Sequence, residues 1–506
     1  MATPDPANVA PWYLRNINQA LALDEATGNV YIRTDAQIGN VTIQGDVNIP
    51  GNINASVYQL GNIDISGNTM PIGGNVGVTG NVNIGSLPEV EIKNDIGNAI
   101  PVTSNYNQFT VGFAPTQTDA FGRFRVSNPF TLFDSFHRFA DNGKINSYSA
   151  NGGTSTYDAA AGVVQINVTT AANSEVIRES SRVFAYQPGK SLLVLQTYCM
   201  GPAQDNLRIR QGYYDAANGF YIQRLGSQVS LVKRSSSSGS LVETVVNQSN
   251  WNVDPMDGTG PSGITLDFTK AQIMWHDLEW LGVGTVRVGF VVNGTFYPVH
   301  YWNHANIVTT SYMTTACLPV RAEIKAISAL AVSATHTIIC TSIMSEGGYQ
   351  LVGKTLSAGH ALNAPITLPD DQTFKPIISM RLKTSRLNGI VLPTNFTIAP
   401  KSSSNFKYRL VIQGITSGGT WVDAGANSCV EYNLAPTTLV SGIDADVGFI
   451  IASNQTAAST SLATTPFAYQ LERNSFTSTA YEFVIMAATT GTNQDVWGAI
   501  GWQEVT

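Results

Sequence analysis

The stretch from Gly39 to Gly85 repeats a six-residue unit in which Gly-Asn or Gly-Asp precedes Val-x-Ile. It runs Gly39-Asn40-Val41-Thr42-Ile43, Gly45-Asp46-Val47-Asn48-Ile49 and Gly51-Asn52-Ile53, resumes at Gly61-Asn62-Ile63-Asp64-Ile65, and closes with Gly80-Asn81-Val82-Asn83-Ile84. A fixed short period is typical of a stacked β array. Within each unit the apolar residues share one face of a short strand, and Gly-Asn supplies the turn. The repeat therefore predicts an elongated β shaft, with an unconnected run of hairpins as the competing interpretation.

The apolar face of this repeat needs a cover that a single coil does not provide. Strands of about three residues cannot bury such a face alone, and their open edges would invite aggregation. Identical chains wound about one axis would cover the face and pair the edges. We therefore expect a homo-oligomer. Its expected interface residues are Val41, Ile43, Val47, Ile49, Ile63, Ile65, Val82 and Ile84.

The composition excludes several classes of protein. Only 12% of the 506 residues are charged, and the net charge is −7, which argues against a nucleic-acid-binding surface. No stretch approaches the roughly 18 consecutive apolar residues of a transmembrane helix. The first residues also lack the basic and apolar regions of a secretory signal. Neither nucleic acid nor a membrane is expected as a partner.

The chain divides into four expected segments of an all-β protein. Residues 1–36 contain two alternating stretches around Glu25-Ala26-Thr27-Gly28, which indicate a β-hairpin, although a helix from Leu14 to Asp24 competes with it. The repeat shaft takes residues 37–112. Two antiparallel β-sandwich or jelly-roll domains are expected at 113–350 and 351–506.

Short strands divided by turn clusters support these two sandwiches. Val291-Val292-Asn293-Gly294-Thr295-Phe296 is the strongest hairpin signal, an Asn-Gly between apolar strands. The segment from Asn454 to Phe476 is polar and is expected to be an exposed loop. The expected strands of the first sandwich are Val163–Val168, Ser191–Tyr198, Leu207–Tyr214, Gly219–Leu225, Val229–Lys233, Val242–Val246, Ile264–Phe268, Ile273–Trp280, Gly284–Val292, Thr295–Tyr301 and Ala322–Ile327.

No group of residues predicts catalysis, a metal or a cofactor. Asp277 and Glu279 alternate along an expected strand and could be imagined as paired glycosidase carboxylates, but they also fit an ordinary half-buried strand. His300 and His304 are four apart, a spacing that brings ligands together on a helix, whereas this stretch is expected to be strand and turn. We therefore predict no enzyme activity, no catalytic residue and no bound metal.

Aromatic residues concentrate in the first expected sandwich. Aromatic rings at the edge of a sheet can stack on sugar rings, although such residues are more often part of the core. The candidates for a glycan-binding surface are Tyr213, Tyr214, Tyr221, Tyr301 and Trp302.

Several further segments belong together. They include Pro11-Trp12-Tyr13-Leu14, Thr118-Asp119-Ala120-Phe121-Gly122-Arg123-Phe124-Arg125-Val126-Ser127, Tyr186-Gln187-Pro188-Gly189-Lys190-Ser191 and Glu279-Trp280-Leu281-Gly282-Val283-Gly284. Taken together, these segments resemble virion structural proteins of tailed phages, in particular contractile-tailed marine phages such as cyanophages. The similarity is best over residues 113–330.

This resemblance implies a virion protein that is assembled in the host cytoplasm. It implies attachment to other virion proteins through the N-terminal segment, and a trimeric shaft. The expected function is a structural, fibre-like or baseplate-associated tail protein. The alternatives are a receptor-binding protein that recognises host surface glycan and a fibre on the head or neck.

Overall fold

The computed structural model describes residues 128–369, 373–401, 405–450, 458–462, 467–489, 491 and 493–505, together with six short strands between Leu21 and Val111. Chain contacts separate residues 1–88 from residues 89–506, and the two units are described separately. The repeat residues from Val41 to Ile84, including every expected oligomer-interface residue, lie outside the described residues.

In the first unit, β1 (Leu21–Leu23) pairs antiparallel with β2 (Val30–Ile32). The predicted N-terminal hairpin is confirmed, and the competing helix up to Asp24 is wrong over Leu21–Leu23. In the second unit, β3 (Ile92–Lys93) pairs with β4 (Ala99–Ile100), and β5 (Val102–Asn105) pairs with β6 (Gln108–Val111).

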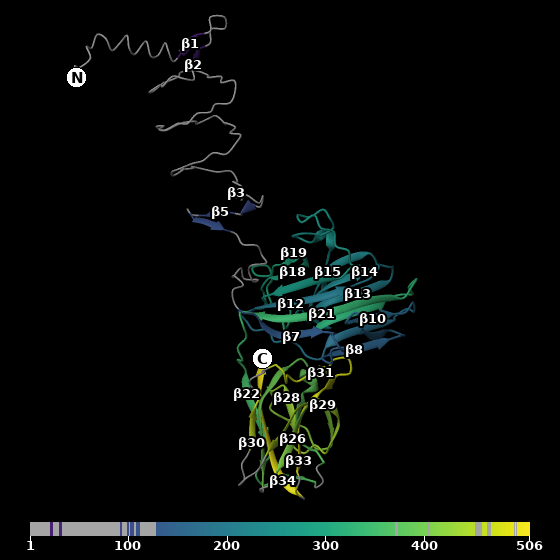
Figure 1. Ribbon diagram of the computed structural model, residues 1–506, viewed down its shortest axis with the longest axis vertical. Helices are drawn as coiled ribbons and strands as arrows, with labels where there is room; N and C mark the ends of the chain where they lie inside the picture. The colour runs from purple at the N-terminus through teal and green to yellow at the C-terminus, as the bar shows by residue number, and fades with distance from the viewer. Residues whose placement is uncertain are drawn as a thin grey trace, which may run out of the picture. The chain divides into compact units, whose positions relative to one another are not determined.

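The prediction of an all-β chain with antiparallel sandwiches is confirmed (Figure 1). The first sandwich, residues 130–346, has an eight-stranded sheet in the order β19-β18-β17-β12-β21-β10-β9, with β7 also paired to β21. Its strands are β7 (Phe130–Phe136), β9 (Thr154–Asp158), β10 (Val163–Val168), β12 (Ser191–Cys199), β17 (Gln272–Leu278), β18 (Val286–Val292), β19 (Thr295–Trp302) and β21 (Ala334–Glu346).

A seven-stranded sheet in the order β16-β15-β14-β13-β20-β11-β8 packs against it. Its strands are β8 (Ile145–Ala150), β11 (Glu175–Ser180), β13 (Leu207–Tyr214), β14 (Gly219–Leu225), β15 (Gln228–Ser235), β16 (Val242–Asn247) and β20 (Val320–Ala326). Alternation sends Leu207, Ile209 and Tyr213 of β13 into the shared core, whereas Arg208 and Arg210 face outward.

The second sandwich, residues 354–505, pairs a five-stranded sheet with a six-stranded sheet. The five-stranded sheet has β22 (Lys354–Gly359), β34 (Gln494–Val505), β25 (Ile390–Pro400) and β30 (Ala458–Ser461) in that order, with β23 (Ile366–Leu368) also paired to β34. The other has β27 (Val422–Asp423), β28 (Val430–Asn433), β24 (Lys375–Leu382), β33 (Glu482–Thr489), β26 (Phe406–Ser417) and β29 (Thr438–Ile450) in that order. A short hairpin joins β31 (Arg473–Asn474) and β32 (Thr479–Ala480).

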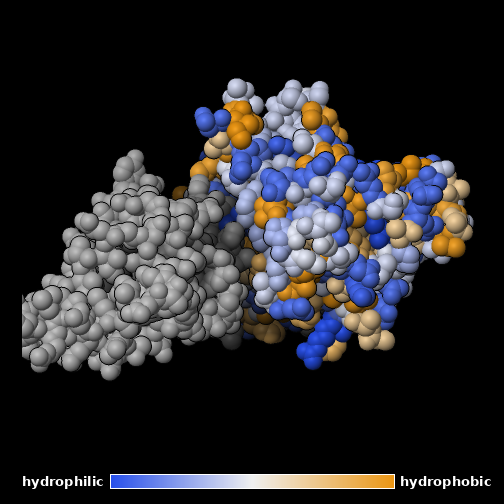
Figure 2. All heavy atoms as spheres, turned by 90° about the horizontal axis from the view of Figure 1, so that it is seen from above, coloured by the Kyte–Doolittle hydropathy of each residue, from blue (hydrophilic) through white to orange (hydrophobic). Residues whose placement is uncertain are grey.

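The Asn-Gly hairpin is confirmed, since β18 and β19 pair on either side of it. Asn293 and Gly294 have φ values of 51° and 77°, the left-handed conformations that a two-residue hairpin turn requires. The predicted strand Ile264–Phe268 is wrong, because only Thr265 bridges, to Asp257, while Asp267 closes a turn on Thr269. Apolar and polar residues are interspersed over the coloured part of the surface in Figure 2, as expected when single apolar side chains remain exposed.

Glu472 and Arg473, which follow β30 in the chain, contact the first sandwich. Arg182 and Glu472 form an ion pair at 3.0 Å, with side chains only 3% and 6% exposed. Arg473 pairs with Glu179 at 2.9 Å, and both side chains are 2% exposed. Ser181 also donates to Glu472 at 2.6 Å. These paired and hydrogen-bonded charges are buried between the two sandwiches, where loss of one partner would leave the other charge uncompensated.

The expected exposed loop from Asn454 to Phe476 is therefore wrong in its described part. Ala458–Ser461 forms an edge strand on β25. Phe467 and Arg473 are buried because they contact the first sandwich, and Leu471 is buried in the core of the second. No helix among the described residues is long and apolar enough to cross a membrane.

Candidate ligand-binding site

The five aromatic residues expected at a glycan surface are mostly core residues. Tyr213, Tyr214 and Tyr221 are each 0% exposed, so none of their rings is available to a sugar. Tyr213 lies in the core, where its hydroxyl donates to the Ala316 carbonyl at 2.8 Å and accepts from the Leu318 amide at 3.0 Å. The sugar-binding interpretation of these three residues is corrected for this reason.

Tyr214 and Tyr221 lie on the outer face of the seven-stranded sheet, under a layer of arginines. Their ring centroids are 4.4 Å apart, and the guanidinium of Arg234 lies 5.4 and 5.1 Å from them. Arg321 covers Tyr214 at 5.5 Å, and Arg210 covers Tyr221 at 5.1 Å. These cation–π contacts occupy the ring faces that a sugar would need. Burial, the largest cause, raises the pKa of Tyr221 to about 12, despite the nearby arginines.

Tyr301 and Trp302 lie side by side at the end of β19, on opposite faces of the sheet. Trp302 is 7% exposed and packs on Phe220, with ring centroids 5.1 Å apart. Tyr301 is half-buried, and its hydroxyl has no hydrogen-bond partner among the described residues. The structure does not bring the five aromatics together into one surface.

Asp277 and Glu279 are both fully buried and engaged. The carboxylate of Asp277 pairs with Arg287 and accepts from the Ser191 hydroxyl at 2.5 Å. Glu279 accepts from the Tyr186 hydroxyl and from the Gly189 amide. A glycosidase carboxylate must reach a sugar and a water molecule, and these two face protein groups instead.

His300 and His304 each serve a local structural purpose. The Nδ1 of His300 accepts a hydrogen bond from the backbone amide of Asn252 at 3.2 Å, and the imidazole ring packs against Trp302. The Nδ1 of His304 donates to the Gly284 carbonyl at 2.7 Å, which leaves Nε2 to accept from Lys233 at 3.1 Å. Burial lowers the pKa of both imidazoles to about 4, so they are neutral near pH 7. Among the described residues, no three His, Cys, Asp or Glu side chains are grouped as metal ligands.

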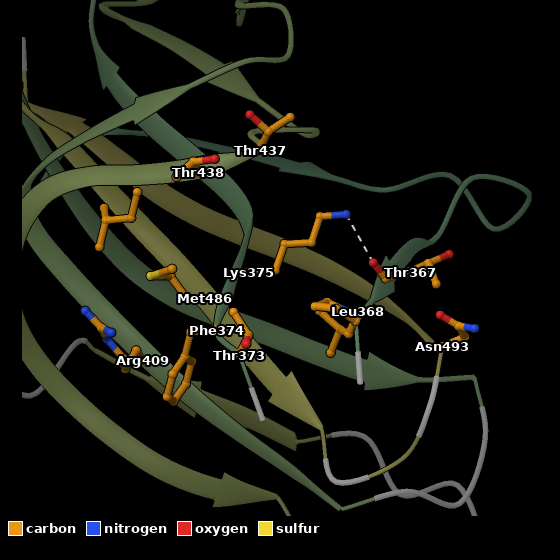
Figure 3. Close-up of a pocket in the computed structure, with 12 residues that line it drawn as sticks. Thr367, Leu368, Thr373, Phe374, Lys375, Arg409, Thr437, Thr438, Met486 and Asn493 are labelled. Carbon is orange, nitrogen blue, oxygen red and sulfur yellow. Dashed lines mark hydrogen bonds between the residues drawn. The ribbon is translucent and has the colours of Figure 1, made fainter. Parts of the chain in front are cut away.

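An open cleft in the second sandwich has a volume of about 750 Å³ (Figure 3). Met486 of β33 lies in the middle of this cleft. On one side are Thr437 and Thr438, at the start of β29, and on the other are Leu368, where β23 ends, and Lys375, where β24 begins. Its lining comes from residues 367–369 and 373–375, from Arg409, from residues 437–439, and from Met486 and Asn493, so parts of the chain far apart in sequence form this cleft. Sequence reasoning missed it because none of these segments carries a recognisable motif.

Two cations line the cleft. The ammonium of Lys375 donates to the Thr367 carbonyl at 3.1 Å, and within the described residues it meets no carboxylate. The guanidinium of Arg409 lies 5.2 Å from the centre of the Phe374 ring and 2.6 Å from Asp444. Asp444 is not among the lining residues, and the described lining residues include no carboxylate. The cleft therefore combines positive charge, hydroxyl groups and an apolar floor.

No family model matches the chain, and no curated relative matches it. Among solved structures, a protein of unknown function from Shewanella oneidensis MR-1 is similar at 12% identity, with a TM-score of 0.30, over 44% of this chain and 91% of that one. Bacillus licheniformis β-glucanase is similar at 11% identity, with a TM-score of 0.27, over 42% and 97%.

The CBM2 module of the evolved Dit of Lactobacillus casei BL23 phage J-1 is similar at 6% identity, with a TM-score of 0.29, over 44% of this chain and 99% of that one. Identities and TM-scores this low carry no argument about ligands or activity. The proposals that follow rest on the residues of this chain.

Proposed function

We propose that this chain is a structural component of a phage virion. In this proposal it is a fibre-like or baseplate-associated tail protein, held by its N-terminal segment and displaying the two sandwiches beyond a repeat shaft. The observation that carries it is the order of parts along one chain. A hairpin and a six-residue repeat precede two sandwiches that buried ion pairs join into one body. The resemblance of residues 113–330 to phage virion proteins supports the same function.

Labelling of intact virions tests this proposal. Antibody raised against residues 354–505 should bind purified particles and mark the tail in electron micrographs. Labelling of the head or neck would support a head or neck fibre instead. Absence of the protein from purified particles would overturn the virion proposal.

The proposed shaft is a homotrimer, and its apolar face offers a direct test. Val47→Asp together with Ile49→Asp would place charges where chains meet. Burial of a Val or Ile side chain contributes about 1.5–3 kcal/mol, so this double variant should dissociate the trimer and leave the sandwiches folded. Analytical ultracentrifugation of the full chain measures the mass. A monomeric wild-type chain, or a double variant that stays trimeric, would contradict the proposal.

A second candidate function is receptor binding, in which the chain recognises a host surface glycan. The specific observation in its favour is the open cleft of the second sandwich, where hydroxyls and two cations surround an apolar floor. Sugar sites combine apolar contact with a few well-placed polar groups. Adsorption of the purified full-length protein to host cells, with loss of adsorption after periodate treatment of the cells, would support it. Unchanged adsorption after this treatment would exclude a periodate-sensitive sugar.

A further inference from the structure

The cleft of the second sandwich is more specific in its chemistry than a general sugar site. Among the described residues, its two charged lining side chains, Lys375 and Arg409, are both positive, although the whole chain has a net charge of −7. A positive cleft in a negatively charged protein selects for a small negative group.

Lys375 is the stronger candidate to bind such a group. It is half-buried, and its ammonium uses one of three donors on the Thr367 carbonyl. No ion pair with a carboxylate competes for the remaining donors among the described residues. Arg409, in contrast, already pairs with Asp444 and contributes a guanidinium held against Phe374.

The floor and walls fit a sugar ring that carries the charge. Met486 is 3% exposed and lies at the base of the cleft, with Phe374 and Leu439 packed against the same cluster. Thr438 is exposed on one wall, and its hydroxyl forms no hydrogen bond within the described chain. The exposed amide of Asn493 lies on the opposite side (Figure 3). Apolar contact below and hydrogen bonding at the sides suit the two faces and the edge of a pyranose.

We infer that this cleft binds a carboxylated sugar residue of an acidic surface polysaccharide. Lys375 receives the carboxylate, Thr438 and Asn493 bind ring hydroxyls, and the half-buried Leu439 contacts the apolar ring face. This inference rests on the receptor-binding function proposed above and names its site and its ligand class. Charge-assisted hydrogen bonds are the stronger ones, so Lys375 should contribute most of the selectivity.

Calorimetric titration of the full-length protein tests this inference with defined probes. An oligogalacturonide should bind, with an affinity that falls as salt is raised. A neutral malto-oligosaccharide of equal length should bind at least about tenfold more weakly. Lys375→Met should weaken oligogalacturonide binding by about tenfold or more. Thr438→Val should weaken oligogalacturonide binding by a smaller factor. This second variant still tests the cleft if Lys375→Met does not fold.

Lys354→Met is the matched control, because Lys354 is an exposed lysine of β22 outside the cleft. It should leave the affinity unchanged. Equal binding of the neutral probe, or unchanged affinity in Lys375→Met, would overturn the inference. Preference for a sulfated oligosaccharide of equal charge would overturn the carboxylate assignment.

Adsorption of the same variants to host cells separates this inference from the function it rests on. Loss of adsorption in Lys375→Met supports both. If the wild type and Lys375→Met adsorb equally, the cleft assignment fails and receptor binding stands. If the wild type does not adsorb, the receptor-binding function fails.

Discussion

The two sandwiches use their polar side chains differently. In the first, arginines cover the rings of Tyr214 and Tyr221, Asp277 pairs with Arg287, and His304 bonds to Gly284 and Lys233. In the second, Lys375 lines an open cleft and forms no ion pair among the described residues. The difference teaches that a dense cluster of aromatic and charged residues can be a scaffold, whereas polar groups that the fold leaves available indicate a candidate ligand site.

Lowering the pH should unfold the first sandwich before the second. Of the predicted effects, this one is the largest. Burial lowers the pKa of His276 to about 3 and the pKa of His300, His304 and His336 to about 4. These imidazoles titrate near 6.5 in the unfolded chain. Between about pH 6.5 and pH 4 the unfolded state binds more protons, so stability falls as the pH falls. Each of these histidines lowers the free energy of unfolding by up to about 3 kcal/mol as the pH falls from about 6.5 to 4.

Hydrogen exchange followed by mass spectrometry at pH 7 and pH 4.5, corrected for intrinsic rates, checks this expectation. Peptides from β12 and β17 should lose protection more than peptides from β26 and β33. His276→Leu should reduce the pH dependence, because both of its ring nitrogens are buried without hydrogen bonds in the described chain. Equal loss in both sandwiches would show that these histidines do not set their acid stability.

Breaking the buried junction should have the next largest effect. Glu472→Ala leaves the buried Arg182 guanidinium with the Phe467 carbonyl as its remaining partner among the described residues. Removing one partner of a buried ion pair typically costs about 3–5 kcal/mol. Urea unfolding should report this loss, together with earlier proteolysis between the sandwiches.

Glu431→Ala is the control for this variant. Its pair with Arg381 is 28% and 22% exposed, so the cost should be about 0–1 kcal/mol. If both variants lose equal stability, the junction is not held by its buried charges.

Removing the hydroxyl group from each of two tyrosines should have the smallest effects on stability. The two variants compare a hydroxyl that is hydrogen-bonded with one that is not. Tyr213→Phe leaves a buried carbonyl and a buried amide without their partner, which costs about 1–3 kcal/mol. Tyr301→Phe removes a hydroxyl without a partner in the described chain and should be neutral or slightly stabilising. Thermal unfolding of the two variants under one buffer condition gives the comparison. A larger loss in Tyr301→Phe would mean that this hydroxyl has a partner the fold does not show.

Local pattern predicted a large part of the fold. Residues Val163–Val168, Leu207–Tyr214 and Gly219–Leu225 were expected as strands and form β10, β13 and β14 with the same bounds. Strands without clear alternation were missed. Glu175–Ser180 contains an arginine and two glutamates, yet it becomes an interior strand, because Arg178 pairs with Asp141 and Glu179 pairs with the buried Arg473.

What the sequence determined by itself is what depends on neighbours along the chain. Period-two alternation placed most strands, the Asn293-Gly294 pair placed a hairpin, and the hexad spacing marked a region distinct from the sandwiches. Only the tertiary structure decided which polar residues are satisfied and which remain open. Tyr221 and Lys375 look equally available in sequence, but packing across strands buries the first under Arg234 and leaves the second at a cleft. The physical reason is that burial and charge pairing depend on residues brought together from distant segments, which no local pattern records.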